Sequence, residues 1–324
     1  MATTAASASQ ERTRDLNVIT RKQRSLWRDA VYRLFRNKAA ILGLAIITLA
    51  AVLAIFAPWI APYDPTDVRI ADGKQAPTLA DPFWGNPAYV DSRFPLGTDT
   101  IGRDTLSRLI WGTRISLIVG FVPVALIFVI GVSIGMIAGY TGGWLDNLLM
   151  RLTDVIYAFP DLLFLVLIQA TLRNTALGEL MGGLVLLFAA LAIVNWVGMA
   201  RLVRGQVLSL KEKEYVEAAR TIGARPGRIM FRHLFPNALA PVIVAVSFGI
   251  PSAMLAEATL GFIGIGIKPP TATWGVMISE GFTVFSATPW AVMLPAICVS
   301  ILMLAFTFVG DGLRDALDPR IRGR

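Results

Sequence analysis

Six apolar stretches divide the chain and set its architecture. They cover residues 39–60, 114–139, 155–172, 181–200, 238–260 and 290–309. Each has about the 20 residues that an α-helix needs to cross the hydrocarbon core of a membrane. None shows the alternating period of a barrel strand, and backbone groups in lipid must pair within a helix. We therefore predict an all-α integral membrane protein with six transmembrane helices.

Composition agrees with a membrane protein and excludes several kinds of chemistry. The chain is 55% hydrophobic and only 16% charged, and its mean hydropathy is +0.62, outside the usual range of soluble domains. Its single cysteine, Cys298, excludes a disulfide framework or a cysteine metal site within one chain. There is no phosphate-binding P-loop, H-E-x-x-H motif or cluster of histidine and cysteine ligands. We expect the chain to bind no cofactor.

Basic residues gather in three segments: the N-terminal arm, residues 201–232 and the C-terminal tail. Six spans place all three on one side, which the positive-inside rule assigns to the cytoplasm. Topology thus explains the net charge of +8 without a nucleic-acid partner. Within the arm, "RSLWRDAVYRLFRNKAA" predicts an amphipathic helix against membrane lipid, and the arm is too long for an ordinary cleaved signal peptide.

The chain divides into consecutive regions on this reading. They are a cytoplasmic arm (1–38), the first span (39–60), an extracytoplasmic cap (61–112), a five-helix core (113–312) and a cytoplasmic tail (313–324). The cap is rich in proline and aromatic residues, which indicates an irregular but ordered structure. It ends in "FPLGTDTIGRDTLSRLIWGTRISLIVG", where Thr98 or Asp99 is expected to cap the next helix.

The second span contains a glycine repeat. Gly131, Gly135 and Gly139 recur every four residues and predict a smooth stripe that another helix approaches closely. The same stretch, "GVSIG", matches the nucleophile pattern of some hydrolases, with Ser133 at its centre. That alternative is disfavoured because the only histidine, His233, lies in a different segment and no strand-turn-helix context is present. We expect a protein that is not an enzyme.

A polar segment, "EYVEAARTIGARPGRIMFRHLFP", separates the fourth and fifth spans. Glu214 and Glu217 near its start and Arg220 near its end favour a short helix, with a contact between Glu217 and Arg220. Gly223 ends that helix, and a second element follows Pro226. We predict a helix-turn-helix elbow at residues 211–235. Its small residues Ala218 and Ala219 suit insertion into a groove on another protein, although the segment alone also fits a plain connection between spans.

Two carboxylates fall within the apolar stretches: Asp161 in the third and Glu257 in the fifth. Ionisable groups within a membrane are functional candidates. We regard both as candidates for a pathway through the membrane or for an interface with a second membrane subunit. A proton-driven transporter that uses them as relay groups is an alternative, but the inverted repeats common in such proteins are not detected here.

The polar segment resembles the EAA signature of permeases in binding-protein-dependent ABC importers, in its Glu217, Ala218, Ala219, Gly223 and Pro236. The general pattern has an aliphatic pair where this chain has His233 and Phe235. Further stretches resemble the C-type permease of dipeptide and oligopeptide importers, so the likeness extends from residue 25 over nearly the whole chain. They include "SLWRDAVYRLFRNKAAI", "RLVRGQVLSLKEKEYVEAARTIGA", "RHLFPNALAPVIV", "LAEATLGFIGIGIKPPTATWGVMI" and "GDGLRDALDPR".

This resemblance implies a type I ABC importer permease fold in a bacterial plasma membrane. The elbow would be its cytoplasmic coupling helix, with Glu217, Ala218, Ala219, Arg220 and Gly223 docking on an ATPase. The implied partners are a B-type permease, two cytoplasmic ABC ATPases that carry ATP and Mg, and an extracytoplasmic solute-binding protein. Peptides are the implied substrates, although members of the family also carry nickel complexes and other solutes. Glu217 is expected to meet a basic partner, and Gly223 to form a turn that a side chain would crowd.

Overall fold

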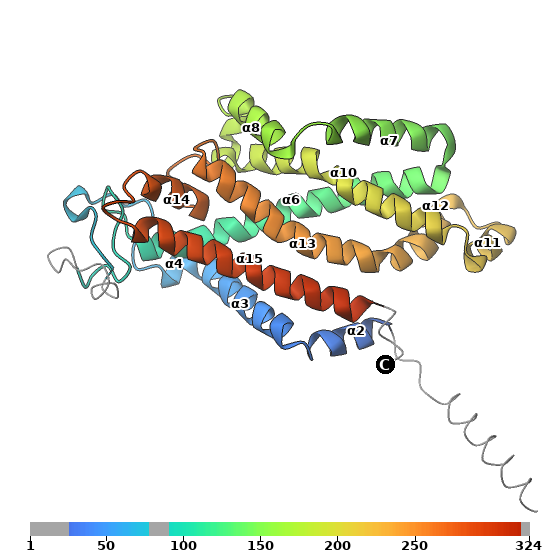
Figure 1. Cartoon of the computed structure of the whole chain (residues 1–324), viewed down its shortest axis with the longest axis horizontal. Helices are drawn as coiled ribbons and strands as arrows, with labels where there is room; N and C mark the ends of the chain where they lie inside the picture. Colours follow the sequence, from blue (N-terminus) through green and yellow to red (C-terminus); the bar gives the residue numbers. More distant parts are fainter. Residues whose placement is uncertain (1–25, 78–90, 319–324) are drawn as a thin grey trace, which may run out of the picture.

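A computed structural model describes residues 26–77 and 91–318, and it forms an elongated helical bundle (Figure 1). Outside the helices, an isolated β-bridge joins Thr98 and Asp104. The principal helices are α2 (Leu26–Leu34), α3 (Lys38–Ile55), α4 (Ala57–Ile60), α6 (Thr105–Thr141), α7 (Gly143–Tyr157), α8 (Asp161–Leu172), α9 (Ala176–Glu179), α10 (Leu184–Leu210), α11 (Glu214–Thr221), α12 (Pro226–Ile229), the π-helix η5 (Met230–Leu234), α13 (Phe235–Phe262), α14 (Trp274–Phe282) and α15 (Trp290–Leu317).

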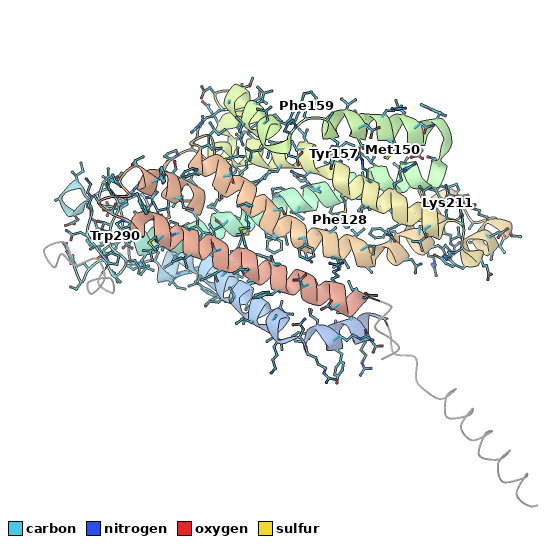
Figure 2. The ribbon with its side chains drawn as sticks, in the orientation of Figure 1. Phe128, Met150, Tyr157, Phe159, Lys211 and Trp290 are labelled. Carbon is cyan, nitrogen blue, oxygen red and sulfur yellow. The ribbon has the colours of Figure 1, made fainter. Side chains whose placement is uncertain are left out.

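Five helical segments in the described part of the chain are long and apolar enough to cross a membrane, and a bent pair supplies a sixth span if counted as one. The bent pair is α7 and α8, which meet at an angle of 79°. The prediction of an uninterrupted span over 155–172 is therefore wrong. Pro160 has no N–H to donate and restricts the preceding Phe159, so the helix ends before it. Figure 2 shows Tyr157 and Phe159 at this junction.

The predicted glycine stripe is confirmed as the contact between α6 and α10. A Cβ atom at Gly135 would lie 2.5 Å from the carbonyl oxygen of Ala200, and one at Gly139 would lie 2.8 Å from Cβ of Val207. The two backbones therefore approach more closely than any side chain on the stripe would permit. Ser133 lies between these glycines on the exposed side of α6, within a continuous helix and not at a strand-turn-helix elbow.

The described parts of the three basic segments lie at one end of the bundle. Figure 1 shows α2, α11 and the C-terminal end of α15 at its right-hand end, and the loop directly before α6 (residues 91–104) at the left-hand end. The helix α2 packs against α15, where Gly312 lies beside Leu34 and Ala40. Asn37 then accepts hydrogen bonds from the N–H groups of Ala39 and Ala40, so a side-chain cap starts α3. Their assignment to the cytoplasmic side stays a prediction.

The opposite end carries the predicted cap, formed in the described structure by residues 61–77 and 91–104; residues 78–90 lie outside it. The helix α6 begins at Thr105, before the predicted boundary at 113, and Asp104 caps it by accepting from the N–H of Ser107. The expectation that Thr98 or Asp99 caps this helix is wrong. Both have other roles: the Thr98 hydroxyl donates to the Asp72 carbonyl, and Asp99 pairs with Arg103 and Arg108.

Candidate functional site

The polar segment forms the predicted elbow at the end of the bundle opposite the cap (Figure 1). The helix α10 ends at Leu210, α11 follows after a short turn, and α12 and η5 return the chain to α13. Lys211 fixes the start of the elbow because its Nζ donates a hydrogen bond to the Gly139 carbonyl at 3.1 Å. Figure 2 shows Lys211 at this end and Trp290 at the cap end.

A small apolar core holds the elbow against the bundle. Val216 and Ala219 of α11 are buried together with Ile229 and Leu234, and this cluster continues to Val207 of α10. Ala219 is 5% exposed, whereas its neighbour Ala218 is exposed. The interpretation of the two alanines as one free, small face is therefore wrong, because successive residues on a helix point in different directions. Ala219 belongs to the elbow's own core, and only Ala218 faces outward.

The charged side chains of α11 face solvent. Glu214, Glu217 and Arg220 are all exposed. The expected contact between Glu217 and Arg220 is wrong: the Arg220 guanidinium lies 5.7 Å from the centre of the Tyr140 ring, and no ion pair joins the two residues in the described structure. The carboxylate of Glu217 is consequently available to a cation on another molecule.

Gly223 ends α11 in a left-handed conformation, with φ of +77°. The following N–H, of Ala224, donates to the Ala219 carbonyl at 3.0 Å and closes the turn. A Cβ atom at Gly223 would meet nothing within 4 Å. The expectation that a side chain would crowd this turn within the chain is wrong; the backbone angle explains the glycine, because a side chain disfavours positive φ.

Two exposed apolar residues of the elbow were missed by the sequence reasoning. Ile222 is 85% exposed and Phe231 is 74% exposed. The sequence does contain a signal for such a surface: an isoleucine stands directly before the turn glycine of a polar segment. His233 and Phe235 depart from the aliphatic pair of the general pattern, yet both pack: the ring of His233 lies beside Tyr215, and Phe235 meets Phe128 edge to face. Figure 2 labels Phe128 nearer the middle of the bundle than Lys211.

A cavity of about 560 Å³ opens between α6, α8, α10 and α13. Its walls are mainly apolar, with Asn195, Ser252 and Thr259 as neutral polar groups and Asp161 as the one charged group in the lining. Asp161 reaches the cavity because the break at Pro160 makes it the first residue of α8. The pathway role of Asp161 stays a prediction.

Glu257 lies elsewhere. It is 2% exposed, faces away from the cavity, and interacts with Thr273 at the start of α14, while its neighbours Ala256 and Thr259 line the cavity. Its Oε1 atom has no hydrogen-bond partner among the residues that the structure describes. The structure therefore does not bring Asp161 and Glu257 into one site. Within the described residues, no group of three or more histidine, cysteine or acidic side chains is arranged to hold a metal ion.

A bundle of membrane-spanning helices that surrounds a cavity and carries a folded polar elbow defines the class of membrane transport subunits. The chain belongs to the family of inner membrane components of binding-protein-dependent transport systems, whose sequence model matches residues 131–323. Residues 25–80 match a second model, the N-terminal transmembrane domain of oligopeptide transport permease C. The resemblance drawn from the sequence is confirmed.

Similar proteins extend over almost the whole chain. The oligopeptide transport system permease protein OppC of Bacillus subtilis is 39% identical over 95% of this chain and 94% of its own length. The dipeptide transport system permease protein DppC of Haemophilus influenzae is 42% identical, covering 89% of this chain and 92% of its own.

Two solved transporters share the fold of about two thirds of this chain. A chain of the MetNI methionine ABC transporter in an inward-facing conformation matches with a TM-score of 0.51 and 22% identity, covering 65% of this chain and 96% of that one. A chain of an amino acid ABC transporter matches with a TM-score of 0.50 and 18% identity, covering 64% of this chain and 93% of that one. The family model and the relatives show that the protein is an ABC importer permease, and the solved structures show that it has the type I fold.

Proposed function

We propose that this chain is the C-type permease of a peptide importer, and that its elbow couples the membrane pathway to a cytoplasmic ATPase. The proposal rests mainly on the elbow surface. Glu217, Ala218 and Ile222 face outward, whereas Val216 and Ala219 on the opposite face of α11 pack against the bundle. A firmly seated helix with unpaired charge and exposed apolar surface suits docking in a groove. The peptide substrate rests on the relatives, which are named for oligopeptide and dipeptide transport.

The proposed assembly places each partner at a different part of the bundle. Two ABC ATPases, which bind ATP and Mg, contact the elbow end on the cytoplasmic side, where the basic segments gather. A solute-binding protein delivers substrate at the cap end. A B-type permease completes the pathway beside the cavity lined by Asp161 and Asn195. This chain contributes half of the pathway and no catalytic group.

In the proposed mechanism the transporter has two states, and the elbow is the moving contact between the permease and the ATPase. Closure of the ATPases on ATP draws the elbows of the two permeases together and opens the pathway outward, and hydrolysis resets it. The continuity of the elbow core with α10 and α13 supports this transmission, because Val207 and Val242 pack in the same cluster as Val216. A displacement of α11 would therefore be carried into helices that line the cavity.

Purification of the tagged chain with its accompanying subunits tests the proposal. We expect a second permease and ATPases in the eluate, ATP hydrolysis, and peptide uptake by the reconstituted assembly. Glu217→Lys and Gly223→Asp should leave the protein inserted but abolish uptake, the first by reversing a charge on the docking surface and the second by adding a charged side chain to the open turn of that surface. Gly227→Ala is the matched control, because Gly227 lies on α12 with open space around it.

Two outcomes would overturn the proposal. Normal uptake in both Glu217→Lys and Gly223→Asp would remove the coupling role of the elbow. A lone chain that transports without ATP and resists vanadate would instead favour the proton-driven alternative, with attention then on Asp161, the carboxylate that reaches the cavity.

A further inference from the structure

A second hollow lies on the outside of the bundle, between α3 and α6. It has a volume of about 450 Å³ and is walled by apolar residues of both helices, with Arg114 as the one charged side chain in its lining. Small residues of α3, Ala51 and Ala54, leave the space open, and Phe121 and Val122 of α6 form its far wall. This groove is separate from the cavity that contains Asp161.

The position of Arg114 along the bundle follows from helix lengths. With 18 residues, α3 is about 27 Å long, close to the hydrocarbon thickness of about 30 Å. Its last residue, Ile55, therefore marks the membrane boundary at the cap end. Arg114 lines the groove together with Ala54 and Ile55, so its guanidinium lies near this boundary. The helix α6, with 37 residues, extends well beyond the hydrocarbon on the same side.

Aromatic residues mark the same level. The Arg114 guanidinium lies 5.7 Å from the centre of the Trp111 ring, and Trp59 on α4, just beyond α3, is largely exposed. Tryptophan is enriched where the hydrocarbon meets the headgroups. A long basic side chain at this depth turns its charged end toward the interface and its stem along the apolar wall.

Arg114 is exposed and forms no ion pair within the part of the chain that the structure describes. By contrast, the neighbouring Arg103 and Arg108 on the same stretch are buried and paired with Asp99 and Glu280. A guanidinium presents several donors in one plane and binds phosphate through two of them. The Arg114 guanidinium is thus available to bind an anion, and it lies at the depth of lipid phosphates.

We propose that the groove between α3 and α6 is a binding site for one phospholipid, whose phosphate pairs with Arg114 and whose acyl chain lies against Ala51 and Phe121. The positive charge of Arg114 complements the lipid phosphate. The apolar floor of the groove continues away from Arg114 toward the membrane interior and complements the acyl chain. The lipid would bridge α3 and α6 and so add to the direct packing of the first span against α15, where Gly43 lies close to Ala305.

Native mass spectrometry of the purified full-length protein with its subunits tests the site. After delipidation, phosphatidylglycerol is added in steps. We expect one lipid to bind before all others, and Arg114→Gln to weaken that binding about tenfold or more, the loss typical of a charge-assisted pair. Arg114→Lys should give an intermediate affinity. Ala51→Phe fills the groove without removing the charge and should weaken binding as well.

Arg151→Gln is the matched control, because Arg151 is an exposed arginine on α7, far from this groove in the fold. Its first-lipid affinity should equal that of the unaltered protein. Equal losses for Arg114→Gln and Arg151→Gln would show non-specific attraction and overturn the proposal. Unchanged binding in both Arg114→Gln and Ala51→Phe would do the same, as would loss of a partner permease from Arg114→Gln with lipid binding intact, since protein would then fill the groove.

Discussion

The cap end and the elbow end of the bundle are both rich in charge, but they use their charged side chains differently. At the cap end, Arg108 contacts Asp99 at 2.6 Å and Glu280 at 2.8 Å, and its side chain is only 2% exposed. Arg103 contacts the same two carboxylates. At the elbow end, Glu217 and Arg220 are exposed and form no ion pair with each other.

This difference distinguishes a self-contained structure from the surface that we propose docks on an ATPase. The network at the cap end joins the loop before α6, α6 itself and α14, so its charges are largely satisfied within the chain. The elbow is held by apolar contacts around Val216 and Ala219, which leave its charges unpaired. Substitutions at the two ends should therefore affect different quantities. Substitutions at the cap end should mainly change stability, and substitutions at the elbow should mainly change association with an ATPase.

The largest effect on stability is expected for Arg108→Leu. Removing one partner leaves the carboxylates of Asp99 and Glu280 incompletely compensated, which for buried pairs costs about 3–5 kcal/mol. We expect a value near the lower end, about 3 kcal/mol, because Glu280 keeps 29% of its side chain in contact with solvent. Thermal unfolding in detergent measures the loss.

Arg93→Gln is the control for that substitution. Arg93 also pairs with two carboxylates at the cap end, Asp72 and Asp91, but 57% of its side chain is exposed. Solvent screens such pairs, so no measurable change in Tm is expected. Equal shifts for Arg108→Leu and Arg93→Gln would mean that burial of the network does not stabilise this end.

A smaller loss is expected for Ala219→Leu at the elbow. Its added carbon atoms must enter the core formed with Val216 and Ile229, and overpacking of this kind costs about 1–3 kcal/mol. The neighbouring Ala218→Leu places the same atoms on the exposed side and should leave Tm unchanged while it reduces ATPase binding. Thermal unfolding and a pull-down with the ATPase distinguish the two. Identical behaviour of the pair would contradict the opposite orientations of these alanines.

The next effect tests the backbone at the end of α11. Gly223→Val forces a branched side chain into positive φ, at a cost of about 1–2 kcal/mol. Gly223→Asn should be milder, because asparagine tolerates this conformation, and no neighbouring atom obstructs it. Limited proteolysis of the elbow measures the local stability. If asparagine were as disruptive as valine, crowding and not the backbone angle would explain the glycine.

Much of the bundle is predictable from sequence because lipid imposes simple rules. Apolar stretches of sufficient length predict the spans, and the spacing of Gly131, Gly135 and Gly139 predicts the close approach of α10. The elbow is likewise predictable, because its glycine and proline breaks interrupt a polar stretch. These features depend on local composition, which the sequence contains in full.

Features that depend on three-dimensional neighbours are not predictable in this way. Helices α8 and α13 are apolar on all sides, so their periodicity does not indicate that Asp161 faces the cavity and Glu257 faces α14. The capping residue of α6 was equally ambiguous, because Thr98, Asp99 and Asp104 are all suitable types. The folded cap determines which of them caps the helix. There Thr98 forms a β-bridge with Asp104, and Asp99 pairs with arginines.

The smallest effect on stability, and the sharpest test of the comparison, is expected for Ile222→Ser. Ile222 is 85% exposed, so its replacement should change the free energy of unfolding by no more than about 0.5 kcal/mol. An exposed isoleucine that docks in a groove would nevertheless contribute to binding, and its loss should weaken ATPase association measurably. Parallel measurements of Tm and of ATPase retention on the tagged assembly test this.

Ile70→Ser supplies the control at the cap end, since Ile70 is 81% exposed there and its replacement should alter neither quantity. If Ile222→Ser retained the ATPase as well as Ile70→Ser does, the exposed apolar surface of the elbow would not be a docking surface, and the contact would depend on Glu217 and its neighbouring charges.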